Sequence, residues 1–452
     1  MDHTQQTALR SLPSAHALAE AAQAMCPSFA WPEFVDAARG ILDDARTRIR
    51  AGGGAEPTLD GLAARVVDRL VSSSLVEASD LINATGVLLH TGLGRARLSE
   101  SAALAAARAA RGHTPLEIDL ERGERGGRAA AVERMLAIAT GAESALVVNN
   151  NAAALTLILT AHADGREVVV SRGEMIEIGG SFRLPEIIEA GGAVLREVGT
   201  TNKTRLDDYR RVINERTAVL LKVHPSNYRV EGFSAEAEID ELVSLGDASG
   251  MLIVHDIGSG LLEPMGICPS EPDAKTSVDA GAGLVFFSGD KLLGAPQAGL
   301  IVGRRAWVDP LRTHPMMRSF RVDKIRLAAL EAVLREHLRG ERPPVIALAH
   351  TDAEEPRRRA GVIVAELGDD ARAVETEAWL GGGSNPSAAL ASAGVSITPR
   401  DGDEEGGARR LRMGRPGVVA RVRRGEIVAD LMGIPPERDP EFVTAVRRCV
   451  LS

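Results

Sequence analysis

Six short apolar runs alternate with longer helical stretches through the middle of the chain, and this alternation strongly constrains the fold. The runs lie at residues 145–148, 167–171, 193–198, 218–223, 251–256 and 283–288. Most of them are followed by a loop that contains glycine, serine or asparagine, and then by a helical pattern. Apolar strands joined by helices form a mostly parallel sheet that is covered on both faces. We therefore predict an α/β fold for this part of the chain.

The flanking segments have different patterns. Ala-rich amphipathic stretches, split by prolines and a glycine loop, occupy residues 14–25, 32–50 and 59–76. This N-terminal segment carries seven arginines and ten acidic residues, so it is mildly acidic. We predict a helical N-terminal domain at 1–78, a large domain at 79–338 and a smaller α+β domain at 339–452.

Composition places the chain among ordinary globular proteins. Its 452 residues are 44% hydrophobic and 25% charged, which suits two or three domains. It has no run of about 18 apolar residues and its N-terminus lacks the features of a secretion signal, so we expect a cytoplasmic protein without a membrane span. Cys26, Cys268 and Cys449 are scattered, and we expect neither a disulfide framework nor a metal site.

Charge and aromatic content argue against a broad nucleic-acid-binding surface. The formal net charge is −9 and aromatic residues make up 3% of the chain. Phosphate contacts depend on local lysine and arginine rather than on net charge, so a local basic patch is not excluded.

Lys291 is the first candidate for chemistry. It follows the apolar run at 283–288, where an α/β protein keeps its functional groups. The chain has only five lysines among its 53 lysine and arginine residues. A desolvated lysine can lose its proton and attack a carbonyl, whereas arginine cannot. The competing interpretation is an ordinary surface lysine after a strand.

A second set of residues fits a pyridine cofactor. Asp256 ends the run at 251–256, where its carboxylate can keep a ring nitrogen protonated, although alone it is equally a helix N-cap. Together with Lys291 it favours pyridoxal 5′-phosphate. Asn149, Asn150 and Asn151 follow a strand and open a helix, whose backbone N–H groups suit phosphate, but such turns are common. Ser288, at the end of the strand before Lys291, is a further candidate for cofactor binding.

Arginines gather in two further stretches. Arg95 lies in a Gly-containing loop, and Arg318 and Arg321 lie not far beyond the lysine loop. Guanidinium groups fork onto carboxylate and phosphate oxygens, so these residues predict an anionic substrate. The alternative is that they belong to solvated surfaces.

Short strings that keep their order over roughly residues 80 to 335 carry a family resemblance. They include Ile82-Asn-Ala-Thr-Gly86, Asp119-Leu-Glu-Arg-Gly-Glu-Arg125, Val147-Val-Asn-Asn-Asn-Ala152, Val170-Ser-Arg-Gly-Glu174, Glu197-Val-Gly-Thr-Thr-Asn202, Leu221-Lys-Val-His224, Ser226-Asn-Tyr-Arg229, Ser288-Gly-Asp-Lys-Leu-Leu-Gly294 and Arg321-Val-Asp-Lys324. In these strings the chain resembles the bacterial selenocysteine synthases, the L-seryl-tRNA(Sec) selenium transferases.

The resemblance implies an aminotransferase-like (fold type I) large domain with pyridoxal phosphate on Lys291 and Asp256 facing the pyridinium nitrogen. It implies that Arg95, Arg318 and Arg321 surround the selenium donor, selenophosphate. The helical N-terminal domain would grip seryl-tRNA(Sec), and the assembly would be a homo-oligomer, a decamer built as a ring of dimers. The implied reaction removes the serine hydroxyl, with Lys291 taking the Cα proton, and adds selenium to give selenocysteinyl-tRNA(Sec).

Two other functions fit parts of the sequence. The acidic N-terminal segment would suit a related pyridoxal phosphate-dependent lyase that acts on a small amino acid or a phosphorylated amino sugar acid without tRNA. A tRNA-binding protein without catalysis would keep the fold but would have no need of Lys291 and Asp256.

Overall fold

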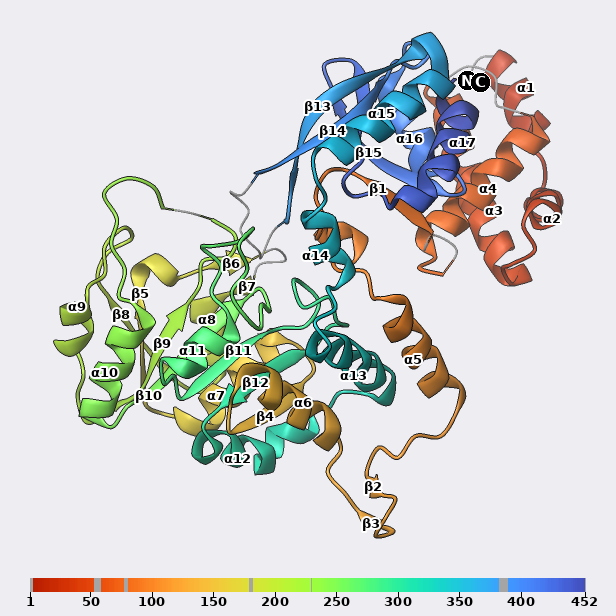
Figure 1. Cartoon of the computed structure of the whole chain (residues 1–452). Helices are drawn as coiled ribbons and strands as arrows, with labels where there is room; N and C mark the ends of the chain where they lie inside the picture. The colour runs from red at the N-terminus through yellow and green to blue at the C-terminus, as the bar shows by residue number, and fades with distance from the viewer. Residues whose placement is uncertain are drawn as a thin grey trace.

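The computed structural model describes residues 3–52, 58–76, 80–178, 182–228, 230–381 and 389–451, and its largest element is a seven-stranded sheet (Figure 1). The strand order is β4-β12-β11-β10-β9-β5-β8. The bounds are β4 (Ser144–Val148), β5 (Glu167–Ser171), β8 (Val194–Val198), β9 (Thr217–Val223), β10 (Leu252–Gly258), β11 (Leu284–Ser288) and β12 (Gly299–Gly303). Pairing is parallel except at β12, which is antiparallel to both neighbours. The predicted α/β fold and its six strands are confirmed.

Both faces of this sheet are buried, because successive side chains of each strand point to opposite faces. In β11, Val285 and Phe287 pack into the core under one face, while Leu284 and Phe286 pack into the core under the other. The first core is covered by α6 (Ala130–Thr140), α10 (Ile239–Ser249) and α13 (Lys324–Leu338), and the second by α7 (Asn151–His162), α8 (Leu184–Ala190) and α12 (Arg305–Thr313). The central strands of the sheet are therefore mostly apolar, and most of their polar side chains lie near the strand ends.

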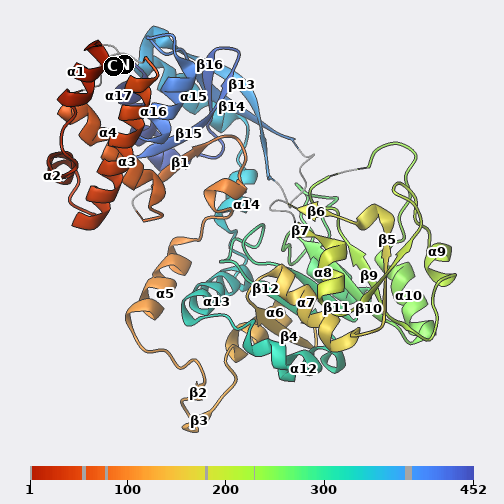
Figure 2. The same ribbon diagram turned by 180° about the vertical axis from the view of Figure 1, so that it is seen from behind.

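A second, five-stranded sheet forms the C-terminal part of the molecule. Its order is β1-β15-β16-β14-β13, with β1 (Leu81–Ala84), β13 (Ala371–Trp379), β14 (Ala389–Ile397), β15 (Gly417–Arg423) and β16 (Glu426–Asp430). Its core is completed by α15 (Glu354–Leu367), α16 (Glu404–Arg412) and α17 (Asp439–Val450). Figure 2 shows this unit apart from the seven-stranded sheet, with α14 (Pro344–Ala349) between them.

The position of β1 corrects the predicted start of the large domain at residue 79. Leu81 pairs with Gly417, and β1 runs parallel to β15 at the edge of the five-stranded sheet. Ile82 and Ala84 are buried in the core of that sheet, which explains why this short apolar strand joins it. The chain enters the C-terminal sheet first and only then crosses to the seven-stranded sheet.

The N-terminal segment is a small helical bundle. Its helices are α1 (His3–Ser11), α2 (Ala15–Met25), α3 (Trp31–Arg50) and α4 (Leu59–Ser73), so the three predicted helical stretches are confirmed. They share a core of their own around Phe34 and Leu42. Figures 1 and 2 both show the bundle beside α16 and α17. Arg415 reaches across from the C-terminal unit to the sulfur of Cys26, at 3.6 Å.

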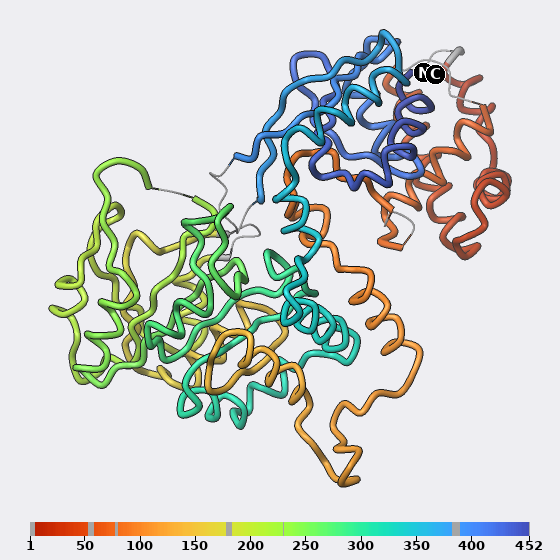
Figure 3. The backbone as a smooth tube through the Cα atoms, in the orientation of Figure 1, coloured from red at the N-terminus to blue at the C-terminus, as the bar shows by residue number. Residues whose placement is uncertain are grey.

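Between β1 and β4 in the sequence, the chain forms an extended arm. Helix α5 (Glu100–Arg111) packs along α13, and the short strands β2 (Ile118–Asp119) and β3 (Glu124–Arg125) follow it. The tube in Figure 3 shows this hairpin projecting away from the body of the molecule. None of the helices in the described ranges is both long and apolar enough to span a membrane.

The C-terminal unit depends on one buried ion pair. Arg359 in α15, whose side chain is 5% exposed, binds the carboxylate of Asp439 at 2.6 and 2.8 Å. It also donates to the backbone carbonyls of Leu431 and Ile434, at 3.1 and 2.9 Å. This arginine therefore joins α15 to the start of α17 and to the chain that leaves β16.

Replacing Arg359 with Met should lower the free energy of unfolding by about 3–5 kcal/mol, because Asp439 and two carbonyls would lose their charged partner. The neighbouring Arg358, 66% exposed and paired with Glu355 within the same helix, is the control. Arg358→Met should change stability by about 0.5 kcal/mol or less. Urea unfolding followed by circular dichroism measures both, and equal stabilities would contradict the assignment.

Candidate active site

Lys291 lies just beyond the end of β11 and is buried. Its side chain donates to the backbone carbonyl of Gly258 at 3.2 Å, and the residue is 6% exposed. Burial lowers the pKa of Lys291, an effect that the nearby Asp256 carboxylate opposes. More of this amine is therefore neutral near pH 7 than in a surface lysine, which is the state a nucleophile needs.

Asp256 faces the same site from β10, the neighbouring strand. Its carboxylate accepts hydrogen bonds from Nδ2 of Asn151 at 3.0 and 3.3 Å and from the Gly258 amide at 3.1 Å. Burial raises the pKa of Asp256, while these hydrogen bonds and Lys291 act in the opposite direction. A buried carboxylate with defined partners is the group that a protonated ring nitrogen would require.

The three predicted phosphate-binding asparagines lie at the start of α7, but their side chains have other partners. Asn150 is the N-cap and accepts from the Ala153 amide at 2.8 Å, and Asn149 accepts from Arg326 at 2.5 Å. Asn151 binds Asp256, as above. The amides that precede Ala153 in the first turn of this helix remain as donors that an anion can bind.

These groups fit pyridoxal phosphate. The site has a desolvated amine for the aldehyde, a buried carboxylate for the ring nitrogen and a helix N-terminus for the phosphate. Among the described residues, Oδ1 of Asn151 and Oδ1 of Asp290 are buried without a hydrogen-bond partner, so polar atoms are left over for a ligand. Ser288, the last residue of β11, is buried close by in sequence.

The predicted arginines are divided between two places. Arg95 has a left-handed backbone (φ 67°) and contacts Asp290, next to Lys291, at 2.8 Å. Arg321 instead lies 3.5 Å from Glu117, a carboxylate that also binds Arg125 and Arg128.

Arg318 ends the 3₁₀ helix η3 (Pro315–Arg318) and is exposed. The structure thus brings Arg95 to the lysine loop, whereas Arg321 joins the cluster around Glu117.

The site also contains a pair that the sequence analysis missed. His224 follows β9, and its amide donates to the carbonyl of Asp256 at 2.9 Å. Its Nε2 lies 3.2 Å from Glu271, whose side chain is 1% exposed. The strand-end rule that selected Lys291 also applies to His224, so this residue was open to prediction. Glu271 lies in a stretch without helix or strand, where no periodic pattern of apolar residues could have predicted its position.

Comparisons with known proteins show the family of this chain. The family model for SelA, L-seryl-tRNA selenium transferase, matches residues 81–435. The chain belongs to this family. It is 44% identical over 421 residues to the L-seryl-tRNA(Sec) selenium transferase of Moorella thermoacetica, covering 90% of this chain and 89% of that one. It is also 44% identical to the protein of that name from Geobacter sulfurreducens, covering 92% and 93%.

A solved structure supports the fold. The structure of D-glucosaminate-6-phosphate ammonia-lyase matches with a TM-score of 0.59 and 21% identity, covering 82% of this chain and 95% of that one. At this identity the likeness concerns architecture alone. The α/β architecture of this chain is therefore shared with that enzyme.

In cofactor-free protein, Lys291 should react with a small amine-specific reagent at a lower pH than the exposed Lys275, because burial lowers the pKa of Lys291. Asp256→Asn should move this pH midpoint further down, since it removes a negative charge that favours the ammonium form. The matched control is Asp279→Asn, which removes the exposed partner of Lys275 at 3.1 Å and should leave Lys291 unchanged. Mass spectrometry of labelled peptides gives both midpoints, and equal midpoints for the two lysines would contradict the prediction.

Proposed function

We propose that this protein converts seryl-tRNA(Sec) to selenocysteinyl-tRNA(Sec), with pyridoxal phosphate at Lys291 and selenophosphate as the selenium donor. The observation that supports this proposal most strongly is the buried Lys291–Asp256 site in a chain that belongs to the selenium transferase family. We place the protein in the cytoplasm as a homo-oligomer, a decamer by family resemblance, with the helical domain at 1–78 contacting tRNA.

Pyridoxal phosphate, when bound, supplies an electron sink for the negative charge that develops at the serine Cα. Asp256 would hold its ring nitrogen protonated, and Asn151 fixes the orientation of that carboxylate at 3.0 Å. The first turn of α7, with Asn149 and Asn150, and Ser288 would hold the phosphate. These roles use the buried amine, the buried carboxylate and the helix N-terminus that the site provides.

Lys291 would also act as the base. Its amine lies in a buried site where burial lowers its pKa, so it could accept the Cα proton of the seryl group. The serine hydroxyl then departs. His224, which Glu271 holds at 3.2 Å, lies at the same sheet edge and can donate a proton to this departing group.

Arg95, Arg318 and Arg321 are proposed to bind selenophosphate. Arg95 lies nearest to the lysine loop through Asp290. Arg321 is paired with Glu117 at 3.5 Å, and a phosphate-like anion would compete with that carboxylate for the guanidinium group.

Lys291→Ala should lower selenocysteinyl-tRNA formation by about a thousandfold or more, because it removes both the attachment group and the base. Lys275→Ala, which changes an exposed lysine, is the control. The assay combines purified protein, seryl-tRNA(Sec) and selenophosphate, with cofactor binding followed by absorbance. Wild-type protein that is full of cofactor and forms no product would refute the function, and tRNA-independent ammonia release from small amino acids would favour the lyase.

Arg318→Ala should raise the KM for selenophosphate by about 10- to 100-fold, the effect of losing a hydrogen bond to a charged group. The KM for seryl-tRNA should change little. Arg335→Ala, at an exposed arginine of α13 that pairs with Glu331 in its own helix, should alter neither value. An unchanged selenophosphate KM in the Arg318 variant would remove this arginine from the donor site.

A further inference from the structure

A cavity of about 590 Å³ lies at the carboxyl ends of β5, β8 and β9. Its walls include Ser171, Thr200, Thr201, Asn202 and His224 at the ends of these strands, and Glu271 from the stretch after β10. Several of the sequence strings that resemble the selenium transferases, at residues 170–174, 197–202 and 221–224, meet here. None of them has a role in the proposed chemistry apart from His224.

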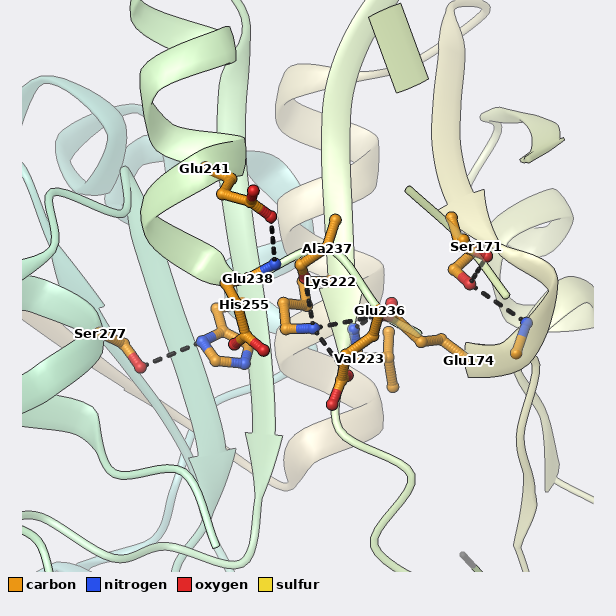
Figure 4. A network of polar contacts seen from close by, with 12 residues as sticks. Ser171, Glu174, Lys222, Val223, Glu236, Ala237, Glu238, Glu241, His255 and Ser277 are labelled. Atoms are coloured by element: carbon orange, nitrogen blue, oxygen red, sulfur yellow. Dashed lines mark hydrogen bonds and ion pairs between the residues drawn. The ribbon is translucent and has the colours of Figure 1, made fainter. Parts of the chain in front are cut away.

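The floor of the cavity is held by a buried ion network (Figure 4). Nζ of Lys222 lies 3.4 Å from Glu174 and 3.1 Å from Glu236, and it donates to the carbonyl of Ala237 at 2.9 Å. Burial alone would lower the pKa of Lys222, but Glu174 and Glu236 outweigh it and raise that pKa. Lys222 is therefore a charged structural group, not a second nucleophile.

The loop on the opposite wall is closely packed as well. Gly199 has a left-handed backbone (φ 68°), and a Cβ atom there would lie 2.2 Å from Oγ1 of Thr204. A Cβ on Gly173 would lie 2.8 Å from the carbonyl of Thr201. Ser171 and Thr204 share a buried hydrogen bond of 2.7 Å. These close approaches require glycine at both positions.

The cavity adjoins the catalytic site through His224. This residue lines the cavity, and its amide is bonded to the Asp256 carbonyl at 2.9 Å. Glu271 lines the cavity too, and its charge acts on Lys291. His224 and Glu271 therefore belong both to the wall of this cavity and to the surroundings of the catalytic pair.

The lining favours a neutral group that can donate and accept hydrogen bonds. Hydroxyl, amide and carboxylate groups dominate it, and among its described residues the cations are Lys203 and the titratable His224, with no arginine. Glu236 and Glu238 place acceptor oxygens at its edge. A phosphate inside the cavity would be repelled by these carboxylates, whereas a free ribose hydroxyl could donate to one of them.

An exposed aromatic ring stands at the rim. Phe233 is 82% exposed, and Nζ of Lys203 lies 2.8 Å from the centre of its ring. Asn202 holds this segment by donating to the carbonyl of Phe233 at 2.6 Å. An exposed ring beside a polar cavity offers a surface on which a nucleic-acid base can stack.

We propose that this cavity binds the 3′-terminal nucleoside of the aminoacyl-tRNA, with the ribose against residues 200–202 and the base stacked on Phe233. The inference rests on the proposed function, since serine is esterified to the ribose of that nucleoside. With the ribose in the cavity, the seryl group points past His224 towards Lys291.

The first test measures steady-state kinetics of the cofactor-loaded enzyme. Phe233→Ala should raise the KM for seryl-tRNA(Sec) by about 5- to 100-fold, the range for loss of one stacked base. The kcat, the selenophosphate KM and the cofactor absorbance should stay within about twofold. Phe233→Trp should restore the KM and Phe233→Leu should not. Val362→Ala, at a 53% exposed position of α15, is the control.

The second test measures binding of 3′-serylamido-3′-deoxyadenosine, a stable mimic of the substrate end, by equilibrium dialysis. Phe233→Ala and Asn202→Ala should both weaken its binding several-fold. Unchanged binding of the mimic and an unchanged KM in the Phe233 variant would overturn the nucleoside site. A different outcome separates the two proposals. If the wild-type protein makes no selenocysteinyl-tRNA but both variants bind the mimic more weakly than wild type, the proposed function is refuted and the nucleoside site stands.

Discussion

The burial of Lys291 beside Asp256 is the interaction on which the rest of the site depends. Two ionisable groups at the end of a doubly covered sheet are stable there because each has specific partners: the Gly258 carbonyl for Lys291, and Asn151 with the Gly258 amide for Asp256. The same burial lowers the pKa of the lysine. Packing that stabilises the sheet thus also prepares the amine for attack and for proton transfer.

Around this pair, the carboxyl edge of the sheet is organised into neighbouring compartments. Helix α7 brings its N-terminus to one side of Asp256, and His224 with Glu271 lies on another side. Beyond His224, the charged Lys222 network fixes the floor of a polar cavity. The two buried lysines of this edge therefore differ in their roles: neighbouring carboxylates keep Lys222 in β9 charged and structural, whereas burial dominates at Lys291 beyond β11.

Much of the fold and part of the site were open to prediction. The six strands, the three N-terminal helical stretches and the strand-end positions of Lys291 and Asp256 follow from local apolar patterns. The prediction for the asparagines was right about the turn but did not anticipate that Asn151 binds Asp256. The start of the large domain was placed too early, because a four-residue apolar strand carries no signal of which sheet it will join.

Local patterning determined the order of strands and helices and placed the scarce lysine at a strand end, while the ordered strings carried the resemblance to the family. The spacing of apolar residues and the ends of strands depend on residues that are neighbours in the sequence, so both can be predicted from the sequence. Only the tertiary structure decided which side chains meet. Asn151 and Asp256 are 105 residues apart, and Arg95 and Asp290 are 195 apart. Such contacts depend on strand order and on helix packing across the sheet, which no local pattern encodes.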